Sequence, residues 1–182
     1  MPRIVATAGN LRAGLNVNRP RFSDVWTHYP HKSAAPDVYK SVGGNIYELF
    51  KENPIAYENA CALRLSQAFN NGGLTITAQA KGYKVKGGDG KLYLLRVNDM
   101  IQFVLANFGK PDLVIAPNGK NIIAEFRGKR GVLIFQVKGW NNATGHVTLW
   151  DGADCGDHCY FEHETLFGIG PETTKISFWE LK

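Results

Sequence analysis

The chain lacks any long hydrophobic run, and none of its apolar stretches approaches the roughly 20 residues that span a bilayer. Residues 1–16 contain no apolar stretch of signal-peptide length, so we expect neither general secretory export nor membrane insertion. Internal repeats and low-complexity tracts are absent as well. The sequence also has no Gly-x-x-x-x-Gly-Lys-Ser/Thr and no Gly-x-Gly-x-x-Gly motif, which argues against the common nucleotide-binding loops.

Cysteine is scarce, with three residues in 182, and a chain of this length buries enough surface to fold without disulfide support. Hydrophobic residues make up 44% and aromatic residues 12%, which is typical of a globular protein. We therefore expect one domain over residues 1–182. The formal net charge of +5 favours a polyanionic partner such as nucleic acid, an anionic membrane or the bacterial wall. The basic residues are scattered, so charge alone does not identify that partner.

The hydrophobic pattern changes from helical spacing in the first half to strand-like runs in the second. Helices followed by clustered strands predict an α+β fold with an antiparallel sheet. The predicted helices cover residues 22–28, 45–50, 59–69 and 100–108, and the predicted strands cover 74–77, 83–86, 92–97, 132–137, 146–150 and 175–180.

Cys61 is the first candidate for chemistry, because it lies in the first turn of the helix predicted after Asn59. Unpaired N–H groups and the positive end of the helix dipole stabilise a thiolate at such a position. A small buried hydrophobic side chain is the alternative role for an isolated cysteine. The position therefore suggests a nucleophile but does not establish one.

His146 is the best-placed base among the five histidines. It follows Gly145 at the start of a predicted strand, and sheet geometry orients an imidazole better than a loop does. A surface histidine on a strand remains the alternative reading.

Two segments together carry a family resemblance. The run Glu58–Ser66 (ENACALRLS), followed about 85 residues later by Gly145–Gly152 (GHVTLWDG), resembles the type VI secretion amidase effectors of family 4. These are papain-like cysteine peptidases that cut peptidoglycan. The likeness extends to Gly43-Gly44, Val97–Met100 and Asp154–Cys159, and spans roughly residues 18 to 180.

The resemblance implies a papain-like fold, with the nucleophile in the helical half and an antiparallel sheet in the C-terminal half. Cys61 would attack, His146 would act as base and later as acid, and Asp157 would orient the imidazole. The backbone N–H of Cys61 is the expected oxyanion donor. The expected activity is hydrolysis of the γ-D-glutamyl–meso-diaminopimelate bond in peptidoglycan stems, with no cofactor and no nucleic acid.

The resemblance also implies delivery from the cytoplasm by a type VI apparatus into the periplasm of a target cell. The partners would be that apparatus, the peptide stems of the wall, and a cognate immunity protein that plugs the cleft.

Geometry supports Asp157 independently, because a reversal at Asp151-Gly152 would bring Asp157 opposite His146. Cys155 and Cys159 would lie about 13 Å apart in an extended strand, whereas a disulfide needs Cα atoms roughly 4.4–6.8 Å apart. We therefore expect the chain to leave the sheet near Asp154 and to hold Asp157 on a loop. In an oxidising compartment, Cys155 and Cys159 would then pair and leave Cys61 free.

Two alternatives use the same residues. A zinc-dependent hydrolase could draw its ligands from His146, Cys155, His158 and Cys159, although their spacing matches no common zinc module. A basic module that binds wall or nucleic acid without turnover would leave Cys61 structural.

Overall fold

In the computed structural model, a four-stranded antiparallel sheet lies at the centre of the C-terminal half, with strand order β5-β8-β6-β7. This confirms the predicted α+β class. The strands are β5 (Leu113–Ile115), β6 (Gly131–Lys138), β7 (Gly145–Trp150) and β8 (Glu172–Glu180). The structure describes the whole chain except residues 1–2, 9–10, 17, 118–121 and 162–169.

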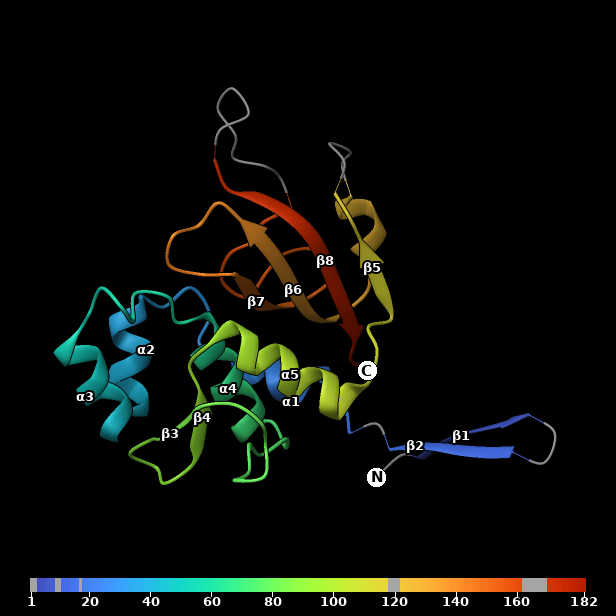
Figure 1. Cartoon of the computed structure of the whole chain (residues 1–182), viewed down its shortest axis with the longest axis horizontal. Coiled ribbons are helices and arrows are strands. Elements are labelled where there is room, and N and C mark those ends of the chain that lie inside the picture. The colour runs from blue at the N-terminus through green and yellow to red at the C-terminus, as the bar shows by residue number, and fades with distance from the viewer. Residues whose placement is uncertain (1–2, 9–10, 17, 118–121, 162–169) are drawn as a thin grey trace.

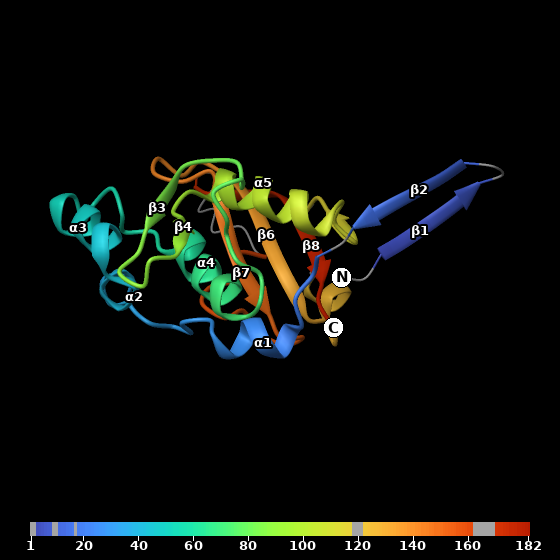
Figure 2. The ribbon, with the colours of Figure 1, turned by 90° about the horizontal axis from the view of Figure 1, so that it is seen from below.

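Three helices cover one face of this sheet: α1 (Phe22–Thr27), α4 (Cys61–Asn71) and α5 (Val97–Phe108) (Figures 1 and 2). Alternate residues of the central strands supply the apolar partners of these helices, as the period of a strand requires. The buried cluster between helices and sheet includes Leu65, Phe69, Met100, Val104, Phe108, Val132, Ile134, Val147 and Leu149.

The opposite face of the sheet carries a second, more aromatic core. A short 3₁₀ helix, η1 (Ile123–Phe126), packs there, and Phe126 makes an edge-to-face contact with Phe178. The cluster comprises Ile122, Phe126, Leu133, Phe135, Val137, Trp150, Cys155, Phe161, Ile176 and Phe178. Because both faces are covered, six of the eight β6 residues are buried.

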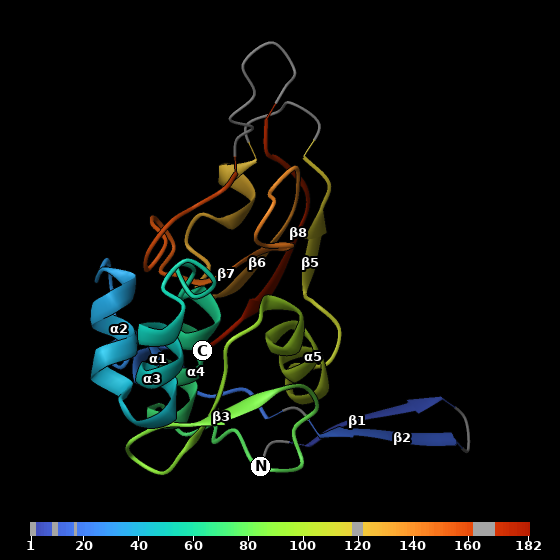
Figure 3. The ribbon, with the colours of Figure 1, turned by 60° about the vertical axis from the view of Figure 1, so that its left-hand side comes forward.

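A third core joins α2 (Ala35–Val42) and α3 (Gly44–Glu52) to the two-stranded sheet of β3 (Lys84–Lys86) and β4 (Leu92–Leu94). These elements lie beside α4 (Figure 3). Gly44 has a φ of +57°, and a Cβ there would lie 2.5 Å from the backbone nitrogen of Gly88. The turn between β3 and β4 therefore requires glycine at this position.

The first residues form a β-hairpin that projects away from the other elements (Figures 1–3). Its strands are β1 (Arg3–Ala8) and β2 (Leu11–Asn16). The other end of the chain is tied down: the N–H of Phe22 donates to the carbonyl of Lys182, and Leu181 is buried. No helix among the described residues is long and apolar enough to cross a membrane.

The sequence-based prediction missed this hairpin and α2, and it placed a strand wrongly at residues 74–77. That segment is irregular because the N–H of Ile76 donates to the side-chain oxygen of Asn70 at 2.8 Å instead of joining a ladder. The strand predicted at 92–97 ends at Leu94, and α5 begins three residues later at Val97.

Candidate active site

Cys61 is the first residue of α4, and its side chain is buried. The helix begins two residues later than the predicted cap at Asn59. Ala60 occupies the N-cap position and provides no side-chain hydrogen bond. The N–H groups of the first turn are therefore not capped by the side chain of the N-cap residue. These donors and the helix dipole meet at the thiol.

His146, on β7, lies between Cys61 and Asp157. Its Nε2 is 3.1 Å from Oδ1 of Asp157, and Cys61 is close enough to the ring to raise the pKa of the imidazole. Because Nε2 donates its hydrogen bond to Asp157, Nδ1 is the ring nitrogen that remains to interact with the thiol. The structure thus brings together all three residues that the resemblance predicts, although they come from three separate segments of the chain.

The electrostatics of this chain favour a charged imidazole. Burial lowers the pKa of His146, but hydrogen bonds and charges from Asp157 and Cys61 outweigh burial and raise that pKa to about 9. Burial likewise raises the pKa of Asp157, yet His146, the Thr148 hydroxyl and the backbone N–H of His158 together lower it to about 2. At neutral pH the pair is therefore imidazolium and carboxylate.

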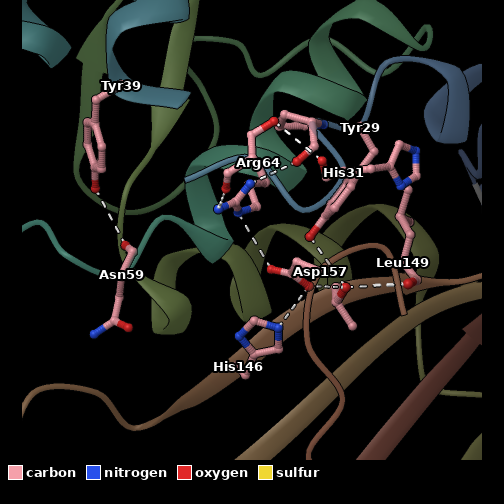
Figure 4. A network of polar contacts seen from close by, with 11 residues as sticks. Tyr29, His31, Tyr39, Asn59, Arg64, His146, Leu149 and Asp157 are labelled. Carbon is pink, nitrogen blue, oxygen red and sulfur yellow. Dashed lines mark hydrogen bonds and ion pairs between the residues drawn. The ribbon is translucent and has the colours of Figure 1, made fainter. Parts of the chain in front are cut away.

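Asp157 is held from behind by a buried polar network (Figure 4). Thr148 Oγ1 donates to Oδ1 of Asp157 at 2.6 Å. Because that bond uses the single proton of the Thr148 hydroxyl, the Tyr29 hydroxyl, 3.3 Å from Thr148 Oγ1, is the donor between these two residues. The Nε of Arg64 lies 3.6 Å from Oδ2 of Asp157. Arg64 also donates to the carbonyls of Pro30 and Ser33, so each of the three guanidinium nitrogens of this buried cation lies near an oxygen atom.

Sequence reasoning missed Arg64, Thr148 and Tyr29 as parts of the site. Arg64 carried the clearest available signal, because it follows Cys61 by three residues and such neighbours share a helix face. A charged residue on the face that points into the protein needs a counter-charge nearby. Tyr29 carried no signal, because only the folded chain brings it to the sheet.

The loop that carries Asp157 is fixed by a disulfide between Cys155 and Cys159, whose Cα atoms lie 5.6 Å apart. This confirms the predicted pair, and Cys61 is free. Gly156 packs under the ring of Tyr29, where an added Cβ would lie 2.7 Å from a ring carbon. The disulfide loop is therefore docked against the segment that follows α1.

The predicted register of this loop was wrong by two residues. The reversal runs from Asp151 to Asp154, and Trp150 pairs with Cys155, so Asp157 comes level with Thr148 rather than His146. The turn is longer than predicted because Asp151 Oδ1 accepts the N–H groups of Ala153 and Asp154. Asp157 still reaches His146 because the chain leaves the sheet, as expected, and bends at the disulfide.

The zinc hypothesis loses its sulfur ligands, because Cys155 and Cys159 are bonded to each other. Among the described residues, no group of three or more His, Cys, Asp or Glu side chains is arranged to hold a metal ion.

Cys61 opens into a cavity of about 410 Å³. Contacts across its rim join segments that are distant in sequence: Asn142 donates to Glu58, and Thr144 donates to Asn98 at 3.2 Å. The cavity is lined by Tyr39, Ala56, Tyr57, Asn59, Cys61, Tyr83, Leu95, Arg96, Val97, Asn98, Asn142, Ala143 and Thr144. A thiol beside an imidazole on the wall of an open cavity suits attack on a carbonyl carbon.

Comparisons with known proteins agree with this geometry. A family model described as type VI secretion system (T6SS), amidase effector protein 4 (Tae4) matches residues 57–179. The fold is similar to Tae4 from Salmonella typhimurium, crystallised with the immunity protein Tai4 from Enterobacter cloacae, with 33% identity and a TM-score of 0.80. That match covers 90% of this chain and 100% of the other.

Tae4 from Enterobacter cloacae is similar both with Tai4 and alone. The complex shows 36% identity and a TM-score of 0.77 over 90% of this chain and 99% of that one. The uncomplexed effector shows 35% identity and a TM-score of 0.76 over 92% and 100%. Among curated proteins, no sequence matches significantly. The chain belongs to family 4 of the type VI secretion amidase effectors, antibacterial toxins with a papain-like fold that hydrolyse peptidoglycan.

Proposed function

We propose that this effector is a cysteine amidase that hydrolyses the γ-D-glutamyl–meso-diaminopimelate bond of peptidoglycan stems. Cys61 is the nucleophile, His146 the base and acid, and Asp157 the residue that orients the imidazole. One observation carries the proposal: the free thiol of Cys61 lines an open cavity and lies next to the His146 imidazole, which hydrogen-bonds with the buried carboxylate of Asp157.

The reaction follows from these contacts. The Cys61 thiolate attacks the amide carbonyl, and the backbone N–H of Cys61 stabilises the oxyanion that forms. The His146 imidazolium then gives its proton to the leaving amine, which departs and leaves a thioester on Cys61. The neutral imidazole next removes a proton from water, and the resulting attack on the thioester releases the acid and restores the Cys61 thiolate and the His146 imidazolium. Asp157 holds the ring in position throughout.

The relatives suggest how the enzyme is restrained and where it works. Three of the similar structures are complexes of Tae4 with the immunity protein Tai4. We infer that a cognate immunity protein binds this chain too and closes the cavity above Cys61. Delivery by a type VI apparatus into the periplasm of a target cell would place the disulfide in an oxidising compartment, where disulfides persist.

Mass analysis of purified peptidoglycan after incubation with the enzyme tests the proposal. Wild type should release fragments that end in D-glutamate, while Cys61→Ala and His146→Ala should release none. Cys61→Ala should also unfold at nearly the wild-type temperature, because only one sulfur is removed. Wild-type turnover in either folded variant would refute the catalytic assignment, and salt-sensitive binding without turnover by the wild type would favour a binding module.

Expression in two compartments tests the site of action. Cytosolic protein should be harmless, because mature peptidoglycan is absent there, whereas protein carrying an export signal should cause lysis that depends on Cys61. Equal toxicity in both compartments would indicate a cytosolic target instead.

A further inference from the structure

The wall of the cavity above Cys61 carries one positively charged side chain, and the carboxylate of Glu58, which accepts from Asn142, lies at the rim. Among the described residues that line it, Arg96 is the sole Lys, Arg, Asp or Glu side chain. It immediately precedes α5, as the N-cap residue, and is exposed. A cavity with one cation and no acidic side chain on its wall favours an anionic ligand.

Arg96 differs from two other arginines of this chain. Arg64 and Arg19 form ion pairs with Asp157 and Asp112, respectively. Arg96 forms no ion pair with any carboxylate among the described residues. Its guanidinium instead lies over the ring of Tyr83, 4.8 Å from the ring centre. Stacking of this kind holds the guanidinium plane while leaving its N–H edge free to donate.

We propose that Arg96, supported by Tyr83, binds a carboxylate of the peptide stem that flanks the scissile amide. This inference rests on the proposed function and adds a specificity-determining residue to it. A glutamate linked through its γ-carboxyl keeps a free α-carboxylate close to the bond that is cut, and diaminopimelate carries carboxylates on the other side. Guanidinium recognises such a group through paired hydrogen bonds, which ammonium does not form.

A bound carboxylate would fix the stem relative to Cys61. Hydrogen bonds between ionised groups are stronger than neutral ones, so replacing the carboxylate by carboxamide should lower kcat/KM about tenfold to a hundredfold. A carboxamide occupies the same volume as a carboxylate but carries no charge. The difference in kcat/KM between the two peptides should therefore depend on the charge of Arg96.

The experiment compares synthetic stem peptides that differ only at one carboxyl group. One series carries carboxylate or carboxamide at the D-glutamyl α-position, and the second carries the same pair on diaminopimelate. Wild type should prefer the carboxylate in one series, which identifies the group that Arg96 binds. Arg96→Gln should abolish this preference by slowing cleavage of the carboxylate peptide, while its cleavage of the carboxamide peptide stays near wild type. Arg96→Lys should retain part of the preference.

Matched variants separate recognition from folding. Arg127→Gln changes another exposed arginine, which does not line the cavity, and should leave the preference intact. Tyr83→Phe should keep the preference because the stacking ring remains, whereas Tyr83→Ala should weaken it. Equal loss on both peptides in Arg96→Gln, or no preference in wild type that cleaves both, would overturn the role of Arg96 and leave the proposed function standing. Cleavage of neither peptide or of peptidoglycan by wild type would overturn the proposed function, and the role of Arg96 with it.

Discussion

The two sides of His146 are built differently. Behind it, Asp157 is buried and held by Thr148 and Arg64, while Tyr29 supports Thr148 in turn. In front of it, the thiol of Cys61 opens into a cavity whose rim is formed by exposed side chains such as Tyr83, which is 46% exposed.

The difference in burial between the two sides of His146 shows that structural and chemical roles are combined on the side of Asp157. The carboxylate side is part of the core, so its residues must carry stability as well as activity. The exposed residues at the cavity rim face solvent, so they can change with little consequence for folding. Substitutions on the two sides should therefore separate activity from stability in opposite ways.

The largest joint effect is expected at Asp157. Asp157→Asn keeps the shape of the side chain but leaves Arg64 without its counter-charge, and breaking a buried pair costs about 3–5 kcal/mol. Activity should fall on the order of a thousandfold or more, because the imidazole loses the group that orients it. Denaturant titration and peptidoglycan turnover should both report the change. Unchanged stability would show that Arg64 and Asp157 are not coupled.

The pH dependence of unfolding sharpens the same contrast. The pKa of His146 is raised to about 9 from 6.5, so its stabilising contribution is fully present below pH 6.5 and is lost as pH rises through 9. The pKa of Asp157 is lowered to about 2 from 3.8, so its contribution is present above pH 3.8 and is lost as pH falls through 2.

The measurement is the free energy of unfolding across this pH range. His146→Gln should remove the alkaline decline expected in wild type. In Cys61→Ala the decline should begin at lower pH, because Cys61 no longer raises the pKa of the imidazole. The same alkaline slope in wild type and His146→Gln would contradict the assignment.

Loss of the disulfide should affect activity more than stability. The ring between Cys155 and Cys159 is short, so the entropic model predicts a stabilisation of about 2 kcal/mol. A displacement of Asp157 by about 1 Å, in contrast, can lower turnover on the order of a hundredfold. The double variant Cys155→Ser/Cys159→Ser should therefore melt only several degrees lower yet turn over far more slowly. Thiol titration of unreduced wild type should find one free thiol, and full activity with three free thiols would refute the role of the bridge.

The smallest effects are expected from two threonines on opposite sides of the site. Thr148→Val removes the hydroxyl that donates to Asp157 and should cost about 1.5–3 kcal/mol of stability. Thr144→Val removes a contact with Asn98 at the cavity rim and should leave stability within about 0.5 kcal/mol. Equal stability losses in the two variants would remove the distinction between the two sides.

Much of the sheet and of the helical half could be predicted from the sequence. The helix expected at 59–69 is observed at Cys61–Asn71, and the strand expected at 132–137 is observed at Gly131–Lys138. The sequences of this helix and this strand have strong apolar patterns, which predict the elements directly. The hairpin of β1 and β2 lacks that signal, because its sequence shows no comparable apolar alternation.

The contact between Cys61, His146 and Asp157 could be predicted because the resemblance identified all three residues. Their support could not, because it depends on where the chain turns. The Asp151 side chain lengthens the reversal by accepting two N–H groups, which shifts the register, and Tyr29 arrives from a segment more than a hundred residues earlier. Periodicity describes single elements and does not contain such long-range placements.

The anchored end of the chain has a practical consequence for fusion proteins. Leu181 is buried and donates to the carbonyl of Arg130, and the carbonyl of Lys182 accepts from Phe22 at the start of α1. A reporter attached after Lys182 would pull on α1, and the segment that follows α1 supports the disulfide loop through Tyr29. A reporter attached before the projecting hairpin would pull on neither. The end chosen for the attachment should thus change the activity that an assay of the tagged toxin records.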